Sequence, residues 1–290
     1  MLDAFADVSL VRDTFAEASD ALGIDLWAVM ADADAINRTE ITQPLMLAAD
    51  IALWRLWQAG GGAAPARVAG HSLGEYAALV AAEVLDLTTA SKLVRARAEC
   101  MNRAPAGAMA AILGLAAEAV VQLCNDLAQG QVLEAVNFNA PGQIVIAGDR
   151  DAIARAVAAA KDHGAKRAIE LPVSVASHCS LMREAARDFA AQLAQVEFRE
   201  PRIQVLHNVD AKPYPAAQIG NVLAAQLDHP VQWIATIQAS LDAGIDTFYE
   251  CGPGKVLVGL GKRMAPDARW LALAERVNFG ELNSVEATHE

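Results

Sequence analysis

Residues 67–76 are Arg-Val-Ala-Gly-His-Ser-Leu-Gly-Glu-Tyr, and they contain a Gly-x-Ser-x-Gly pentapeptide centred on Ser72. A short apolar strand is predicted before the pentapeptide, and an amphipathic helix, Leu73 to Ala82, is predicted after it. This context is typical of a nucleophile elbow, a tight turn that exposes a reactive serine. Gly70 and Gly74 are expected to allow the turn by removing Cβ atoms where backbone segments nearly touch. The alternative is a glycine-rich strand–helix turn whose serine has no chemical role.

The chain has 290 residues and a formal net charge of −12, and its length suits one large domain or a domain with an insert. The negative charge argues against nucleic acid as the main partner. No apolar run approaches the roughly 20 residues of a membrane span. The N-terminus lacks the basic and apolar segments of a secretory signal. We therefore expect a cytoplasmic protein with no membrane or nucleic-acid partner.

The cysteines are scattered along the chain and form no Cys-x-x-Cys pair. They are Cys100, Cys124, Cys179 and Cys251. This spacing argues against a disulfide framework and against a zinc site, and it fits a reducing compartment. We therefore expect no bound metal and no disulfide.

Strand and helix patterns from Met109 to Leu171 follow the order βαββαβ, which is that of a ferredoxin-like split unit. Proline and glycine at 105–107 and proline at 172 mark its boundaries. We therefore predict a ferredoxin-like subdomain over residues 107–172. It is inserted into a catalytic domain made of residues 1–106 and 173–290.

The larger domain is predicted to begin with an amphipathic helix over Leu2–Leu22. Thr42-Gln43-Pro44 is predicted to open a second helix, with Pro44 in its first turn. After the insert, strands again alternate with helices, which predicts a parallel sheet covered by helices on both faces. The predicted fold class is α/β, with a serine-hydrolase-like sheet and an inserted βαββαβ subdomain.

A serine nucleophile needs a base within hydrogen-bond reach. The turn should aim His71 away from Ser72, His163 is expected to cap a helix, and His289 lies in the polar tail. A loop that leaves the insert carries His178, and catalytic residues are often held on loops by a rigid scaffold. The residues alone favour His178 but leave three candidates, which are His178, His207 and His229.

Four motifs resemble those of the malonyl-CoA:acyl carrier protein transacylases of type II fatty acid synthesis, in the family's order and over nearly the whole chain. They are Gly70–Glu75 (Gly-His-Ser-Leu-Gly-Glu), Asn137–Gln143 (Asn-Phe-Asn-Ala-Pro-Gly-Gln), Pro172–Ser174 with Ser177-His178, and Gly252–Leu257 (Gly-Pro-Gly-Lys-Val-Leu). The resemblance implies a serine-hydrolase-like domain carrying a ferredoxin-like insert, as the patterns also predict.

The resemblance also implies roles for single residues. Ser72 would be acylated by malonyl, and His178 would be its general base. In this family a main-chain carbonyl orients the histidine, and the matching position here is Gln226. Without the resemblance, Asp228 is the more obvious candidate for the acid of a triad. The N–H of Leu73 would donate one hydrogen bond to the oxyanion.

Malonyl differs from acetyl by a carboxylate, which a planar guanidinium binds through two parallel hydrogen bonds. Arg95, Arg97 and Arg103 are candidates from the sequence, and the resemblance places the substrate arginine at Arg97. The alternative for Arg97 is a solvated helix arginine paired with Glu99 or another neighbour.

The chain departs from the family at its N-terminus. Members of the family begin with a strand and a Phe-Pro-Gly-Gln-Gly-Ser-Gln segment, whose first glutamine supplies a second oxyanion donor. Here Met1-Leu2 falls where the first helix should begin. We expect that the natural protein starts upstream of this methionine; the alternative is a shortened and weakened enzyme.

The resemblance implies a ping-pong acyltransferase that moves malonyl from coenzyme A to acyl carrier protein for fatty acid biosynthesis. Malonyl-CoA would be the substrate, coenzyme A the product, and no cofactor would be bound. The alternatives are a serine esterase or thioesterase, and a non-catalytic module that binds a carrier protein. Five basic residues are candidates for docking an acidic carrier protein at a cleft between the domains. They are Lys166, Arg167, Lys255, Lys262 and Arg263. The alternative is that they are ordinary solvated surface charges.

Overall fold

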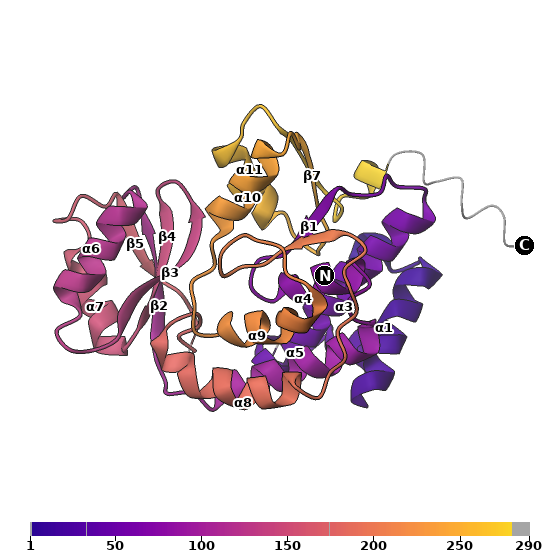
Figure 1. Ribbon diagram of the computed structural model, residues 1–290, viewed down its shortest axis with the longest axis horizontal. Coiled ribbons are helices and arrows are strands. Elements are labelled where there is room, and N and C mark those ends of the chain that lie inside the picture. The colour runs from indigo at the N-terminus through magenta and orange to yellow at the C-terminus, as the bar shows by residue number, and fades with distance from the viewer. Residues whose placement is uncertain (1, 33, 174, 280–290) are drawn as a thin grey trace, which may run out of the picture. The chain divides into compact units, whose positions relative to one another are not determined.

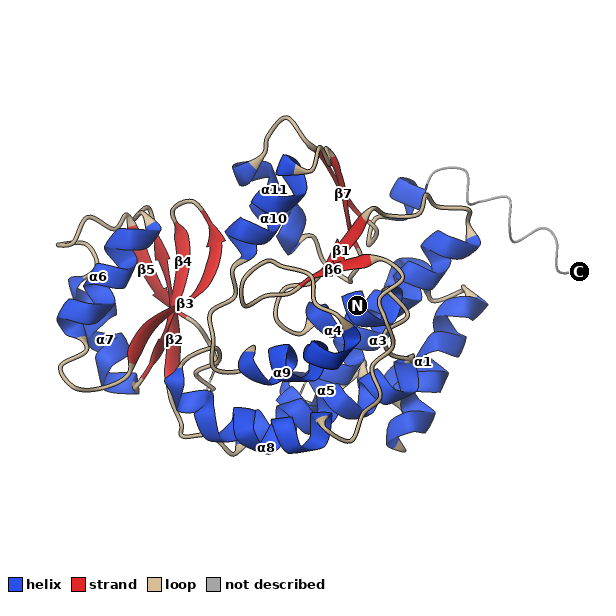
Figure 2. Cartoon of the chain, in the orientation of Figure 1, coloured by secondary structure: helices blue, strands red, loops and turns tan. Residues whose placement is uncertain are grey.

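The computed structural model describes residues 2–32, 34–173 and 175–279. Helices and strands alternate through most of the chain (Figure 2). In chain order the elements are η1 (Asp3–Phe5), α1 (Ser9–Leu22), α2 (Leu26–Val29), η2 (Ala35–Asn37), α3 (Thr39–Ala59), β1 (Arg67–Ala69), α4 (Gly74–Ala81), α5 (Leu87–Asn102), β2 (Ala108–Leu113), α6 (Ala117–Leu127), β3 (Leu133–Ala140), β4 (Gln143–Gly148), α7 (Arg150–Ala159), β5 (Arg167–Glu170), η3 (Ser180–Met182), α8 (Arg183–Leu193), β6 (Gln204–Leu206), α9 (Ala216–Ala225), α10 (Trp233–Asp242), β7 (Thr247–Glu250), α11 (Val256–Met264) and β8 (Arg269–Ala272).

The chain divides into two compact units, which are described separately. The first unit contains Met1–Ala98, Arg199–Val205 and Gly244–Glu290, and the second contains Glu99–Phe198 and Leu206–Ala243. The second unit includes the predicted insert, 107–172, and is larger than it. The division into a catalytic domain and an insert at these boundaries therefore stays a prediction.

In the first unit, helices α1 and α3 pack against each other, and Arg55 of α3 forms a 2.7 Å ion pair with Glu17 of α1. Among the described residues, the strands of this unit form two separate pairs. Strand β1 pairs with β6, and β7 pairs in parallel with β8. The predicted α/β class is confirmed, although the sequence did not indicate the short strand β8.

The second unit contains the predicted ferredoxin-like sheet. Its strand order is β3-β4-β2-β5, and β2 with β4, β2 with β5 and β3 with β4 all pair antiparallel. Helices α6 and α7 cover one face (Figure 1) and share with it a buried apolar core that includes Ala110, Ile112 and Val120. Because side chains alternate along a strand, Met109 faces the other side and packs there with Cys179, the neighbour of His178.

Two predicted helix starts were wrong. Helix α1 begins at Ser9, after a separate 3₁₀ turn, rather than at Leu2. Helix α3 begins at Thr39, because the amides of Ile41 and Thr42 both donate to the carbonyl oxygen of Arg38 at 2.8 Å. Pro44 therefore lies inside the helix rather than in its first turn.

Within the described ranges, no helix is long and apolar enough to cross a bilayer. The same ranges contain no group of three or more His, Cys, Asp or Glu side chains arranged to hold a metal ion. His289, which the sequence places in the polar tail, lies outside the described residues.

Candidate active site

The elbow around Ser72 adopts a conformation that few residues other than glycine tolerate. Ser72 has φ +51° and lies between the end of β1 and the start of α4. Such strained backbone is concentrated at functional sites, where the surrounding structure enforces it. The strained serine between a strand and a helix matches the predicted elbow.

The two glycines of the pentapeptide have different roles. A Cβ added to Gly70 would lie 1.9 Å from the carbonyl carbon and oxygen of Gly74, so no side chain fits at Gly70. A Cβ added to Gly74 would meet nothing within 4 Å. The prediction that both glycines relieve a close backbone approach was therefore right for Gly70 and wrong for Gly74.

Leu73 presents a main-chain donor next to the serine. The amide of Gly74 donates to the oxygen of His71 at 3.0 Å, and that of Glu75 donates to the oxygen of Ser72 at 3.1 Å. No acceptor for the N–H of Leu73 is found among the described residues. A donor at a helix N-terminus is suited to stabilise negative charge that develops beside it.

Arg97 is the cation beside the nucleophile. Its side chain comes from α5 and is only 2% exposed, so the alternative of a solvated helix arginine is wrong. Nη2 donates to Ser72 Oγ at 3.1 Å, and Nη1 donates to Gln43 Oε1 at 2.9 Å. Burial lowers the pKa of Arg97, while Tyr76 and Glu75 act in the opposite direction.

The other two arginine candidates have different surroundings. Arg103 belongs to the second unit, where it contacts Cys100 Sγ at 3.2 Å and forms a 3.4 Å ion pair with Asp188. Arg95 is half-buried on α5. Of the three candidates, Arg97 contacts Ser72 Oγ.

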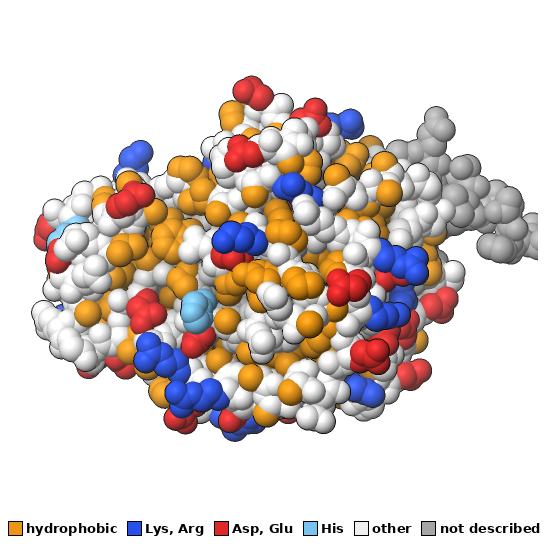
Figure 3. Space-filling model, in the orientation of Figure 1, with side chains coloured by type: hydrophobic (Ala, Val, Ile, Leu, Met, Phe, Trp, Pro, Cys, Tyr) orange, Lys and Arg blue, Asp and Glu red, His pale blue; other side chains and the backbone are white. Residues whose placement is uncertain are grey.

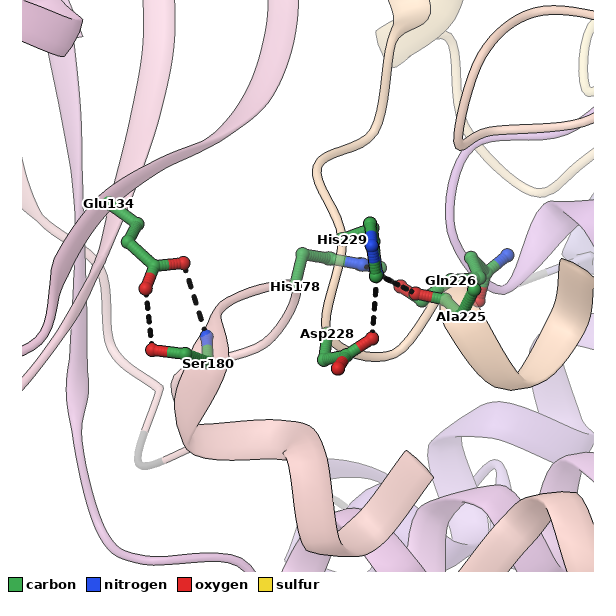
Figure 4. Close-up of polar contacts among 7 residues, drawn as sticks. All are labelled: Glu134, His178, Ser180, Ala225, Gln226, Asp228 and His229. Atoms are coloured by element: carbon green, nitrogen blue, oxygen red, sulfur yellow. Dashed lines mark hydrogen bonds and ion pairs between the residues drawn. The ribbon is translucent and has the colours of Figure 1, made fainter. Parts of the chain in front are cut away.

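In the second unit, His178 is held by main-chain groups. It has φ +66°, a second strained position, and its ring is buried. Nδ1 lies 2.7 Å from the carbonyl oxygen of Gln226, and the His178 amide donates to the oxygen of Leu227 at 2.9 Å (Figure 4). Because a carbonyl oxygen only accepts, Nδ1 carries the proton and Nε2 is the acceptor in the neutral ring.

Asp228, the more obvious acid from the residues alone, contacts a different histidine. Asp228 Oδ1 lies 2.7 Å from Nδ1 of the exposed His229, whose Nδ1 is also 2.9 Å from the oxygen of Ala225 (Figure 4). His207 is buried, and its ring packs edge-on against Tyr214 with centroids 5.5 Å apart. His178 has the carbonyl contact that the resemblance implies for a base, whereas the exposed His229 contacts both a carbonyl and a carboxylate.

Glu134 fixes the chain just after His178. Its carboxylate accepts hydrogen bonds from the amide of Ser180, at 3.1 Å, and from the Ser180 hydroxyl (Figure 4). Glu134 belongs to β3, so the four-stranded sheet anchors the start of η3. No pattern in the sequence indicates this contact.

The cysteines are poor competing nucleophiles. Burial is the main cause that raises the pKa of Cys124, Cys179 and Cys251 to about 12 each, and it also raises the pKa of Cys100. A thiol reacts as its thiolate. These four groups are therefore protonated and unreactive at neutral pH.

The candidate docking residues are exposed, and they divide between the two units. Lys166 and Arg167 lie at the start of β5 in the second unit. In the first unit, Lys255 forms a 3.0 Å ion pair with Glu275, and Lys262 and Arg263 lie in the last turn of α11. On the face that Figure 3 shows, basic and acidic side chains are intermixed.

Comparison with known proteins identifies the family. The model of the acyl transferase domain matches residues 3–269. The chain belongs to the acyl transferase family. It is 48% identical over 281 residues to the malonyl CoA-acyl carrier protein transacylase of Escherichia coli K12, covering 95% of this chain and 91% of that protein.

Solved structures of this acyl transferase family agree with the fold. An acyl carrier protein S-malonyltransferase from Vibrio cholerae superposes with a TM-score of 0.91 at 48% identity, covering 94% of this chain and 91% of that one. A malonyl-transacylase in complex with its type II PKS acyl-carrier protein superposes with a TM-score of 0.89 at 46% identity, covering 93% of this chain and 89% of that one.

Proposed function

We propose that this acyltransferase moves malonyl from malonyl-CoA to the phosphopantetheine thiol of acyl carrier protein, and that it supplies fatty acid biosynthesis. The observation that carries the proposal is the buried Arg97, whose Nη2 lies 3.1 Å from Ser72 Oγ. A fixed guanidinium beside a nucleophile selects acyl groups that end in a carboxylate. The relatives named for malonyl transfer support the same substrate.

In the first half-reaction, Ser72 Oγ attacks the thioester carbonyl of malonyl-CoA and its proton passes to His178 Nε2. The C–O bond forms, and the negative charge on the carbonyl oxygen is stabilised by the N–H of Leu73. The C–S bond then breaks and coenzyme A leaves, taking the proton from His178. The carbonyl of Gln226 holds the ring in the tautomer that this exchange requires, since it binds Nδ1–H.

In the second half-reaction, the thiol of the carrier protein attacks the malonyl-serine ester. His178 takes the thiol proton as the C–S bond forms, and it returns that proton to Ser72 Oγ as the C–O bond breaks. Arg97 binds the malonyl carboxylate in both halves. Two half-reactions that share one covalent intermediate give ping-pong kinetics, with the carrier protein as the second substrate.

The carrier protein also needs a docking surface. The formal net charge of −12 repels an acidic partner at long range, so docking requires a local positive patch. We assign this role to the exposed Lys166 and Arg167, and to the α11 group formed by Lys255, Lys262 and Arg263. The ion pair between Lys255 and Glu275 makes Lys255 the weakest of the five.

Mass spectrometry after brief exposure to malonyl-CoA tests the proposal. The protein should gain one malonyl group on Ser72, and Ser72→Ala should gain none. Arg97→Ala should lose malonyl transfer by at least tenfold, because a charge-assisted contact is worth about 1.5–3 kcal/mol, while acetyl transfer from acetyl-CoA stays unchanged or rises. A plain esterase would show no dependence on Arg97, and a non-catalytic binding module would show no labelling.

A further inference from the structure

Gln43 is a buried polar side chain inside an apolar helix, and the sequence suggested for it only a place at a helix start. It lies on α3 and is 6% exposed, and Ile41 and Leu45, two positions away on either side, are also buried. An amide is buried among apolar residues at a cost unless it is hydrogen-bonded. Gln43 Oε1 accepts a hydrogen bond from Arg97 Nη1 at 2.9 Å.

We propose that Gln43 is a positioning residue that fixes the plane of the Arg97 guanidinium and thereby sets the preference for malonyl over acetyl. The inference rests on the proposed role of Arg97 in carboxylate binding. The two terminal nitrogens of Arg97 have separate partners, Gln43 Oε1 for Nη1 and Ser72 Oγ for Nη2. One contact reaches the scaffold, and the other reaches the reacting atom.

The two contacts behave differently during the reaction. Acylation turns Ser72 Oγ into an ester oxygen, which is a weaker acceptor than a hydroxyl, so Nη2 becomes available to the malonyl carboxylate. Gln43 takes no part in the covalent change and keeps its hold on Nη1. The guanidinium can therefore exchange its partner at Nη2 while its plane stays fixed.

A fixed plane matters because an arginine recognises a carboxylate through parallel hydrogen bonds in one plane. Without Gln43 Oε1, the guanidinium loses the contact that joins Nη1 to α3, and its plane is held less firmly. Acetyl has no carboxylate and does not depend on this plane. Loss of Gln43 should therefore reduce malonyl transfer selectively, whereas a general packing defect would reduce both acyl groups together.

The test is competition for Ser72. The full chain is exposed to equimolar malonyl-CoA and acetyl-CoA, and the ratio of malonyl-serine to acetyl-serine is read from intact mass. Gln43→Met removes the acceptor with little change in volume, and the ratio should fall about tenfold or more. Gln58→Met makes the same chemical change at an exposed site of α3 and should leave the ratio at the wild-type value.

Gln43→Glu keeps an acceptor at the same place and covers the case in which Gln43→Met does not fold. Its carboxylate should pair with Arg97 and compete with malonyl, which lowers the ratio of malonyl-serine to acetyl-serine several-fold. A wild-type ratio in Gln43→Met, or in Gln43→Glu where Gln43→Met does not fold, overturns the inference.

Arg97→Ala separates this failure from a failure of the proposed function. If Arg97→Ala loses the malonyl preference while the Gln43 variants keep it, Gln43 has no positioning role and the carboxylate site stands. If Arg97→Ala reduces malonyl and acetyl labelling equally, the carboxylate site itself is wrong, and the positioning role of Gln43 is overturned with it.

Discussion

At the scale of the residue, His178 receives its orienting contact from a main-chain oxygen rather than from a carboxylate. This arrangement predicts an unusual mutational pattern. His178→Ala should slow acylation by about 10²–10⁴, the usual effect of losing a positioned base. Gln226→Met should leave acylation within a few-fold of wild type, because the carbonyl that accepts from Nδ1 remains.

Variants of the neighbouring pair provide the control. Asp228→Asn and His229→Ala alter a pair formed by a half-buried carboxylate and an exposed imidazole, and they should have little effect on acylation. Rates of Ser72 labelling, measured by quenched mass spectrometry, check all four variants. A larger loss in Asp228→Asn than in His178→Ala would show that the carboxylate supports catalysis and that the carbonyl assignment is wrong.

Asp50 is a second buried group with a measurable effect, in this case on stability. It lies on α3, and burial, followed by the nearby Glu250, raises its pKa well above its ordinary value. In the unfolded chain Asp50 ionises at a pH of about 4, but in the native state it stays protonated up to its raised pKa. Between these two pH values, the native state binds more protons than the unfolded state. Stability therefore falls as pH rises through this window, by up to about 1.4 kcal/mol per unit.

Asp50→Asn removes this titration. The variant should gain stability over wild type as the pH rises from 5 to 8, and the two should converge as the pH approaches 4. Urea unfolding at several pH values measures the difference. A gain that does not change with pH would mean that Asp50 is ionised in the folded protein.

These residues differ in how far the sequence could indicate them. Ser72 was predicted from its pentapeptide alone, because strand, turn and helix are local. Gln226 came only from the family resemblance, since any residue has a carbonyl and no side-chain pattern marks it. Gln43 was missed because its partner, Arg97, is 54 residues away along the chain.

At the scale of the element, the turn between β1 and α4 depends on one glycine more than the other. Gly70→Ala would place a Cβ 1.9 Å from the backbone of Gly74, where no flexible side chain can move aside. It should destabilise the protein by about 3 kcal/mol, the upper part of the usual range for overpacking, and abolish Ser72 labelling.

Gly74→Ala is the matched control. Its Cβ would meet nothing within 4 Å, and Gly74 is the first residue of α4. Alanine is favoured over glycine in a helix by about 0.5–1 kcal/mol, so the variant should be as stable as wild type or more stable. Equal thermal unfolding of the two variants would show that the close approach at Gly70 does not constrain the turn.

The elements themselves were predictable where the pattern was long. The βαββαβ order was predicted from residues 109–171, because alternating strands such as β2 and β4 and amphipathic helices such as α6 repeat within it. Strand β8 and helix α2 have four residues each, and such short segments do not show a hydrophobic periodicity. The early start of α3 depends on two amides that donate to the same oxygen, that of Arg38. The hydrophobic periodicity of the sequence does not indicate such hydrogen bonds.

At the scale of the whole molecule, the sequence indicated the family but not the grouping of the chain into units. Ser72 and Arg97 fall in the first unit, and His178 and Gln226 fall in the second. The second unit collects segments far apart along the chain, including 99–106 and 206–243, around the predicted insert. Such grouping depends on long-range packing that a local pattern does not encode.

Net charge also acts on the whole molecule, and it governs the encounter with the carrier protein. Lys166→Glu with Arg167→Glu reverses two exposed charges in a protein that is already at −12. The KM for carrier protein should rise about tenfold, and slow hydrolysis of malonyl-serine, which needs no carrier, should be unchanged. Added salt should weaken the wild-type association and affect the variant less, because screening removes an attraction that the variant has already lost.

The control for this prediction reverses the same amount of charge elsewhere in the second unit. Lys161→Glu with Arg187→Glu changes two exposed residues outside the docking group. If attraction were a property of net charge alone, both double variants would raise the KM equally. If Lys166 and Arg167 form part of the docking surface, the KM rises mainly in their variant, because charges that lie more than a Debye length from the partner contribute little. Identical carrier kinetics in that variant and in wild type at low salt would remove both residues from the surface.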